Sequence, residues 1–180
     1  YQDEAVICYD KPAGLPTQPT LDEARLNLYA MAKKENAYVG LHHRLDRDTS
    51  GVVIFTRQRE HNAFIAKQFR EHLCTKQYVA VVRGKLENPK GRIESFLAEV
   101  KRQGKQARFG SVKSGGKKAI TDYQVLFEAK DYTMIEVDIT TGRTHQIRVH
   151  LAEMGHPVVG DGLYGGPGEN SLQLGRHLLH

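Results

Sequence analysis

The stretch that decides the fold is TMIEVDIT, residues 133 to 140. In it Ile135, Val137 and Ile139 alternate with the acidic residues Glu136 and Asp138. Successive side chains of a strand point to opposite faces, so this alternation predicts a strand with one apolar and one charged face. The apolar face has to pack on a core, which requires further elements around it.

Strands also dominate the sequence that precedes this stretch. Three segments with β-branched or alternating residues are predicted strands: KQYVAVVRG (76–84), GRIESFLAEV (91–100) and AITDYQVLFEA (119–129). In the last of them, Tyr123, Val125 and Phe127 are expected on one face. Because these strands follow one another without helices between them, we predict an α+β domain with a mixed, mainly antiparallel β-sheet core flanked by helices.

The first part of the chain combines strands and helices. Four elements are predicted from their apolar patterns: strands over 5–9 and 51–57, and helices over about 21–35 and 59–72. The first helix is expected to begin at Thr20 and Glu23, which have the spacing of a capping box. The strand GVVIFTR (51–57) is expected to be buried because most of its residues are β-branched or aromatic.

A third helix is predicted over His145 to Met154. Ile147, Leu151 and Met154 recur at helical spacing, and the glycine and proline that follow are a helix stop. A helix N-terminus offers free N–H groups and partial positive charge to an anion. Arg143 stands just before this N-terminus, so the start of the helix is a candidate anion site.

Length, charge and cysteine content set broad limits. The chain has 180 residues and a formal charge of +5, which suits one domain and permits a polyanionic partner. Cys8 and Cys74 form no CxxC pair, which fits a reducing, cytoplasmic setting. No membrane segment or targeting peptide is predicted. The chain begins at Tyr1 and not at methionine, so we expect a trimmed form of a longer protein.

Positive charge concentrates in one segment, Lys101 to Lys118. It holds seven Lys or Arg, four Gly and no acidic residue. One interpretation is a solvated, mobile surface loop. The other is a flexible arm that follows the phosphates of a nucleic acid. Composition does not choose between them.

The segment HHRLDRD, residues 42 to 48, is the densest cluster of potentially reactive side chains. Four of them superficially resemble the ligand set of a metal-dependent phosphohydrolase: His42, His43, Asp46 and Asp48. Adjacent histidines point in different directions, however, and Arg44 and Arg47 would place two cations beside the metal. We therefore predict no metal site here.

Asp46 retains two interpretations. It is either a partly buried carboxylate that an arginine holds in a turn, or a carboxylate kept ionised to act as a nucleophile or base. Ser50 and Ser171 lie in no GxSxG elbow, and no phosphate-binding glycine motif is present, so serine hydrolases and nucleotide-binding proteins are disfavoured.

HRLDRDTSG (43–51) closely resembles the catalytic motif of the RluA-type pseudouridine synthases, which isomerise uridine to pseudouridine in RNA. Other blocks of that family match in the family's order: KPAGLPTQP (11–19), KQYVAVVRG (76–84), TGRTHQIRVHLAEMGHPVVGDGLYG (141–165) and RHLLH (176–180). On this agreement the chain is identified as a member of the family.

The resemblance implies a role for three catalytic residues. Asp46 matches the essential aspartate, which is the nucleophile or base. Arg143 matches the arginine that pairs with this carboxylate. Tyr78 matches the tyrosine that stacks on the flipped uracil and is a candidate for proton removal at C5.

Three further residues match positions that bind the substrate. Arg44 corresponds to the arginine that enters the RNA stack where the uridine has been flipped out, and Ile147 to the apolar residue beneath the base. Lys76 is expected at the edge of the site. A flipped base leaves a vacated space and requires a flat face to lie on, which these residue types supply.

The resemblance also implies the setting of the reaction. It needs no metal and no organic cofactor, its partner is RNA (rRNA or tRNA), and we expect a monomer without an obligatory protein partner. Residues 1–180 are expected to be the catalytic domain, without the S4-like domain of many relatives. Asp46 is expected to attack C6, to attack C1' or to deprotonate C2'. The competing functions are a non-catalytic RNA-binding module and a metal-dependent phosphohydrolase.

Overall fold

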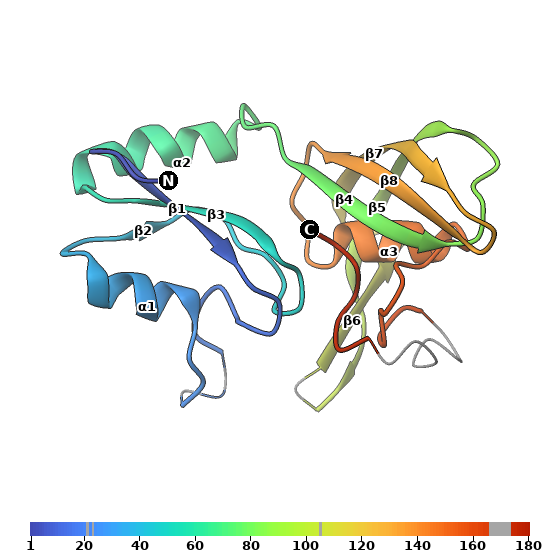
Figure 1. Cartoon of the computed structure of the whole chain (residues 1–180), viewed down its shortest axis with the longest axis horizontal. Helices are drawn as coiled ribbons and strands as arrows, with labels where there is room; N and C mark the ends of the chain where they lie inside the picture. The colour runs from blue at the N-terminus through green and yellow to red at the C-terminus, as the bar shows by residue number, and fades with distance from the viewer. Residues whose placement is uncertain (21, 23, 105, 166–173) are drawn as a thin grey trace. The chain divides into compact units, whose positions relative to one another are not determined.

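The computed structural model describes residues 1–20, 22, 24–104, 106–165 and 174–180. The chain divides into two compact units, Tyr1–Cys74 and Thr75–His180. Figure 1 colours them from blue to green and from green to red, and each unit is described by itself below. Within the described residues, no helix is long and apolar enough to cross a membrane.

The first unit contains a small antiparallel sheet and short helices. Its strands lie in the order β1-β3-β2. The elements are β1 (Val6–Lys11), α1 (Leu28–Glu35), β2 (Gly40–Leu41), β3 (Gly51–Thr56), the 3-10 helix η1 (Arg59–His61) and α2 (Asn62–Arg70). The predicted strands and the helix after β3 are thus present. The central strand β3 is buried on one face only, because Val53 and Phe55 are inaccessible whereas Val52 is 57% exposed.

The predicted start of the first helix is wrong. Leu21 and Glu23 lie outside the described residues, but α1 begins only at Leu28, where Asn27 is the N-cap and its side chain accepts a hydrogen bond from the Ala30 N–H at 2.9 Å. The N–H groups of Leu28 and Tyr29, the first two residues of α1, donate to the carbonyls of Pro16 and Thr17. These carbonyls come from a preceding segment, so the capping box pattern could not reveal them.

The second unit is built on a five-stranded antiparallel sheet in the order β4-β8-β7-β5-β6. Its elements are β4 (Gln77–Arg83), β5 (Lys90–Gln103), β6 (Gln106–Ser111), β7 (Lys117–Glu128), β8 (Tyr132–Ile139) and α3 (Gln146–Glu153). Both units combine helices with antiparallel sheet, so the predicted α+β class is confirmed. The predicted helix over 145–154 is also confirmed, to within one residue at each end.

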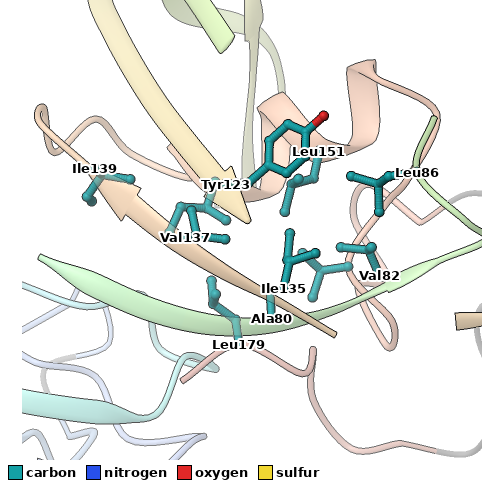
Figure 2. Close-up of a cluster of buried hydrophobic side chains, with 11 residues drawn as sticks. Ala80, Val82, Leu86, Tyr123, Ile135, Val137, Ile139, Leu151 and Leu179 are labelled. Carbon is teal, nitrogen blue, oxygen red and sulfur yellow. The ribbon is translucent and has the colours of Figure 1, made fainter. Parts of the chain in front are cut away.

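One apolar core holds the second sheet against α3. On β8, Ile135 and Val137 are completely buried and Ile139 is 9% exposed, as the alternation predicts. These side chains belong to the same buried cluster as Leu151 of α3, and Figure 2 shows Ile135 close to Leu151. The edge strand β4 is covered by the end of the chain, since Val79 N–H donates to the His180 carbonyl at 2.8 Å.

The expected alternation of β7 fails at its end. Tyr123 is buried, but Phe127 is 64% exposed. The pairing of β7 with β8 shifts register between Val125 and Phe127, so the period-two pattern is interrupted there. An irregularity of backbone pairing is not visible in the spacing of apolar residues.

Most of the described part of the basic segment Lys101 to Lys118 is β-structure. It includes the end of β5, the whole of β6 and the first residues of β7, with an irregular connection over 112–116. Figure 1 shows β6 and the end of β5 projecting together from the rest of this unit. Part of its charge is engaged locally, because Arg102 forms two hydrogen bonds with the Glu99 carboxylate at 2.6 and 2.7 Å.

The core position of Leu151 gives a test of this fold. Leu151→Ala removes apolar contacts from a completely buried site, so the free energy of unfolding should fall by about 2 to 5 kcal/mol. Leu126→Ala, at a leucine that is 49% exposed, is the matched control and should change it by no more than about 0.5 kcal/mol. Urea unfolding measures both, and equal losses would contradict the assignment of the core.

Candidate active site

The loop that carries Arg44 and Asp46 connects β2 to β3 in the first unit. Its backbone is held by a residue from the preceding proline-rich segment. The Thr17 hydroxyl donates to the Leu45 carbonyl at 2.9 Å and accepts from the Leu45 N–H at 3.1 Å. Since Leu45 is the neighbour of Asp46, these two bonds restrict the chain directly before the carboxylate.

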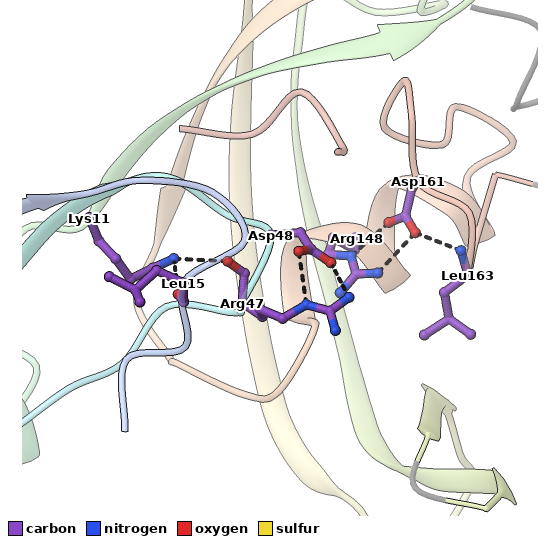
Figure 3. A network of polar contacts seen from close by, with 7 residues as sticks. All are labelled: Lys11, Leu15, Arg47, Asp48, Arg148, Asp161 and Leu163. Atoms are coloured by element: carbon purple, nitrogen blue, oxygen red, sulfur yellow. Dashed lines mark hydrogen bonds and ion pairs between the residues drawn. The ribbon is translucent and has the colours of Figure 1, made fainter. Parts of the chain in front are cut away.

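A buried ammonium holds the chain on the other side of Asp46. Lys11 is completely buried, and its Nζ donates to the carbonyls of Pro12, Leu15 and Arg47 at 2.8 to 3.0 Å. Figure 3 shows two of these bonds, to Leu15 and to Arg47. A buried ammonium is costly unless it is hydrogen bonded, so Lys11 ties KPAGL to the residue that follows Asp46.

The side chains around Asp46 differ in exposure. Asp46 is partly exposed, as the first residue of a turn that the Thr49 N–H closes onto the Asp46 carbonyl at 3.2 Å. Arg44 is exposed. Asp48 accepts two hydrogen bonds from the Arg47 guanidinium at 2.8 and 2.9 Å (Figure 3).

The two adjacent histidines of this loop have structural contacts. His43 Nε2 accepts the Ile54 N–H at 2.9 Å, at a position beyond the last pair of β2 with β3, and the ring stacks on Phe69. His42 Nε2 lies 3.1 Å from Thr56 Oγ1, and burial lowers its pKa. Both rings therefore fasten the loop to β3. Across the described ranges, no three His, Cys, Asp or Glu side chains are grouped to hold a metal ion.

In the second unit, Lys76 and Tyr78 lie at the start of β4. The Lys76 Nζ donates to the Thr140 carbonyl at 3.2 Å and stands beside Gly142. Tyr78 is partly buried, pairs with Val137 and packs on the core that also contains Ile147. Because β4 and β8 are antiparallel, the start of β4 and the end of β8 meet at one edge of the sheet.

Arg143 is in the connection from β8 to α3. Its N–H donates to Gln146 Oε1 at 3.0 Å, and its Nε donates to the Lys118 carbonyl on β7 at 2.9 Å. Lys76, Tyr78 and Arg143 thus belong to the same end of the second unit. Ile147 is 5% exposed and belongs to the core, so its place beneath a bound base stays a prediction.

Polar residues that hold this connection were not predicted from the sequence. Thr141 and Gln146 are buried, and the Thr141 hydroxyl donates to Gln146 Oε1 at 2.7 Å. His145 has a left-handed backbone with φ of 56°, which is uncommon for a residue other than glycine, and its Nδ1 lies 2.8 Å from the Tyr164 hydroxyl. The only sign of these contacts in the sequence was the presence of polar residues beside Gly142.

A buried ion pair joins α3 to the segment that follows it. The Arg148 guanidinium donates to Asp161 at 2.7 and 2.9 Å, as Figure 3 shows, and Asp161 also accepts the N–H groups of Leu163 and Tyr164. Burial would raise the pKa of Asp161, but the hydrogen bonds and the charge of Arg148, together with His177 and the Leu163 N–H, outweigh burial and lower it. Because removing one partner would leave a buried charge, the pair fixes the segment after α3.

Comparison with known proteins assigns the family. Residues 5–153 match the family model described as RNA pseudouridylate synthase. The chain therefore belongs to the RNA pseudouridylate synthase family, and the resemblance seen in its motifs is confirmed. The motif blocks that carried the resemblance from 11–19 to 76–84 lie wholly inside the matched range.

Relatives with curated names are similar to most of the chain. It is 37% identical to the uncharacterized RNA pseudouridine synthase YhcT of Bacillus subtilis. The similarity extends over 188 residues and covers 100% of this chain and 60% of the relative. It is 36% identical to ribosomal large subunit pseudouridine synthase D of Borreliella burgdorferi, over 92% of this chain and 53% of the relative. The chain thus spans between half and two thirds of the length of these two relatives.

Solved structures share the fold. Human RNA pseudouridylate synthase domain containing 1 matches with a TM-score of 0.82 and 26% identity, covering 100% of this chain and 74% of that chain. Human RNA pseudouridylate synthase domain containing 4 matches with a TM-score of 0.79 and 23% identity, covering 100% and 80%. The second similarity, at lower identity, bears on the fold alone.

The buried histidine of α3 gives a pH-dependent prediction. His150 is completely buried between the hydroxyls of Ser95 and Thr121, and burial lowers its pKa below the ordinary value of 6.5. Below about pH 6.5 the unfolded chain binds a proton that the folded chain does not bind. The free energy of unfolding should therefore fall with decreasing pH, by up to about 1.4 kcal/mol per pH unit for this proton.

Urea unfolding between about pH 7.5 and about pH 5.5 measures this slope. In His150→Gln the slope should be smaller, because glutamine does not titrate. His61→Gln, at a side chain that is 38% exposed, is the control and should keep the slope of the unaltered protein. An unchanged slope in His150→Gln would show that the buried ring is not responsible.

Proposed function

We propose that this protein isomerises specific uridines of structured RNA to pseudouridine. The observation that carries the proposal is the family match over residues 5–153, which includes Asp46 on a loop whose backbone is held on both sides. In the reaction the C1'–N1 bond breaks and a C1'–C5 bond forms, while C5 loses a proton and N1 gains one. Restricting the carboxylate in advance lowers the entropic cost of reaching the reactive geometry.

The proposed catalytic residues are Asp46, Arg143 and Tyr78. Asp46 acts as nucleophile or base, at C6, at C1' or at the C2' proton. Arg143 provides a guanidinium that favours the ionised carboxylate, and Tyr78 provides the face on which the extruded uracil lies and a candidate base for the C5 proton. Asp46 belongs to the first unit and the other two residues to the second, and residues 1–180 are proposed to be the catalytic domain.

Three more residues are proposed to bind the substrate. Arg44 is exposed, as suits a side chain that enters the RNA stack. Lys76 stands beside Gly142 and carries positive charge to the edge of the site. Ile147 supplies apolar support below Tyr78, which packs on the same core.

The RNA substrate is proposed to be ribosomal RNA or transfer RNA. One relative, from Borreliella burgdorferi, is named a ribosomal large subunit pseudouridine synthase. We further propose that the protein acts in the cytoplasm, as a monomer, without an obligatory protein partner. A pseudouridine map of rRNA and tRNA in a deletion strain identifies the modified site.

Replacement of the proposed catalytic carboxylate tests the activity. With RNA labelled by tritium at uridine C5, Asp46→Asn should release tritium at least about 10³-fold more slowly, because an amide cannot act as nucleophile or base. Asp48→Asn, at a carboxylate of the same loop that forms an ion pair with Arg47, is the matched control and should remain within about threefold of the unaltered protein.

Other outcomes of the same assay favour other functions. Release that continues in EDTA supports the synthase, and absence of tritium release together with hydrolysis of phosphoesters that is lost on chelation would favour the metal-dependent phosphohydrolase. Binding of RNA without tritium release from any cellular RNA would favour a non-catalytic RNA-binding module.

The basic segment Lys101 to Lys118, which includes the projecting β5–β6 hairpin, is proposed to contact RNA phosphates. Lys101 and Lys113 are exposed, and in the described part of the chain neither forms an ion pair. The double variant Lys101→Gln and Lys113→Gln should weaken RNA binding, and the slope of log affinity against log salt should decrease by about 0.7 to 0.9 for each lost phosphate contact.

Filter binding at several salt concentrations measures this slope. The matched control is the double variant Lys85→Gln and Lys130→Gln, which removes the same charge from exposed positions outside the basic segment. The same loss in both double variants would mean that only net charge matters, and the basic segment would have no particular role.

A further inference from the structure

The side chain of Gln146 uses its full hydrogen-bonding capacity inside the second unit. Its Oε1 accepts from the Thr141 hydroxyl at 2.7 Å and from the Arg143 N–H at 3.0 Å. Its Nε2 donates to the Ile120 carbonyl at 2.8 Å and to Thr121 Oγ1 at 3.0 Å. An amide has two acceptor sites and two donor hydrogens, so all four are occupied at a residue that is only 3% exposed.

These four contacts give the amide one orientation. If the oxygen and nitrogen exchanged places, Nε2 would face the N–H of Arg143 and Oε1 would face the carbonyl of Ile120. Both contacts would then be repulsive. Gln146 is therefore a defined bridge between β7 and the connection that carries Arg143.

The bridge is reinforced on the side of the connection. Thr141 Oγ1 accepts the Ile120 N–H at 3.0 Å while its hydroxyl donates to Gln146. The Arg143 Nε donates to the Lys118 carbonyl at 2.9 Å. Hydrogen bonds thus hold both the backbone and the side chain of Arg143 against β7. The backbone is held through Gln146, and the side chain is held directly.

The bridge also continues into the core. Thr121 Oγ1, which accepts from Gln146, lies 2.9 Å from His150 Nδ1, and His150 Nε2 lies 3.0 Å from Ser95 Oγ on β5. Thr121 and His150 are completely buried. A buried network in which every member is satisfied is rigid, because displacing one group leaves polar atoms without partners.

We propose that Gln146 is a positioning residue, which aims the Arg143 guanidinium for the isomerisation by fixing the Arg143 backbone against β7. The proposal rests on the function proposed above, in which Arg143 favours the ionised carboxylate. A misplacement of a catalytic group by about 1 Å lowers a rate by about 10²-fold. The alternative is that Gln146 only stabilises the start of α3.

A double-mutant cycle in the full chain separates the two roles. Gln146→Met should lower the single-turnover rate of tritium release by about 10- to 100-fold while the affinity for RNA stays unchanged. In the background of Arg143→Lys, where the guanidinium is absent, the same substitution should lower the rate by less than about threefold. Thermal unfolding should show the same loss of stability in both backgrounds.

Two further variants complete the design. Gln146→Glu keeps an acceptor for the Arg143 N–H, so it should react faster than Gln146→Met, and it replaces the methionine variant in the cycle if that variant does not fold. Leu151→Ala, destabilised in the core, should keep its rate within about twofold when it is assayed in the folded state. A rate that merely follows stability across these variants would overturn the proposal.

The outcomes distinguish this inference from the function on which it depends. Equal rate losses from Gln146→Met in both backgrounds would overturn the positioning role alone. An undiminished rate in Arg143→Lys would overturn the role of Arg143, and the positioning role with it. Absence of tritium release from the unaltered protein on every RNA tested would overturn both proposals.

Discussion

The arrangement of the second unit depends on the burial of one face of β8. Ile135 and Val137 are inaccessible, and a shift of this strand by one residue would turn them to the other face. The register of β8 with β4 places the start of β4, which carries Lys76 and Tyr78, beside the end of β8. The chain then leaves β8 at that edge through the connection that holds Arg143, so the core also decides where the cationic groups gather.

Buried polar groups then restrict the connections that the apolar core leaves undefined. In the first unit Lys11 binds three carbonyls and Thr17 binds both backbone groups of Leu45, so the loop of Asp46 is held on both sides. In the second, Gln146 does the same for the connection of Arg143. Each of these groups would be costly to bury unpaired, which makes them stronger restraints than surface ion pairs.

The sequence predicted the strands and helices whose formation depends on residues close together in the chain. The alternation in β8 and the spacing of Ile147, Leu151 and Met154 are local patterns, and both elements are present as expected. The predicted start of α1 was wrong because the N–H groups at its true start donate to the carbonyls of Pro16 and Thr17. Neither interpretation of the basic segment, as a mobile loop or as a flexible arm, predicted its strands, because lysine and glycine have low strand propensity whereas the pairing of β6 with β5 decides its structure.

The candidate chemistry came from the sequence alone, because Asp46, Tyr78 and Arg143 stand in motifs whose order identifies the family. Only the tertiary structure decided how the loops of Asp46 and Arg143 are held, and which buried residues hold them. The bonds from Thr17 to Leu45 and from Gln146 to Ile120 join residues that are 28 and 26 positions apart. Such bonds form because folding removes both polar groups from water together. The partner of each group therefore cannot be predicted from the residues next to it in the sequence.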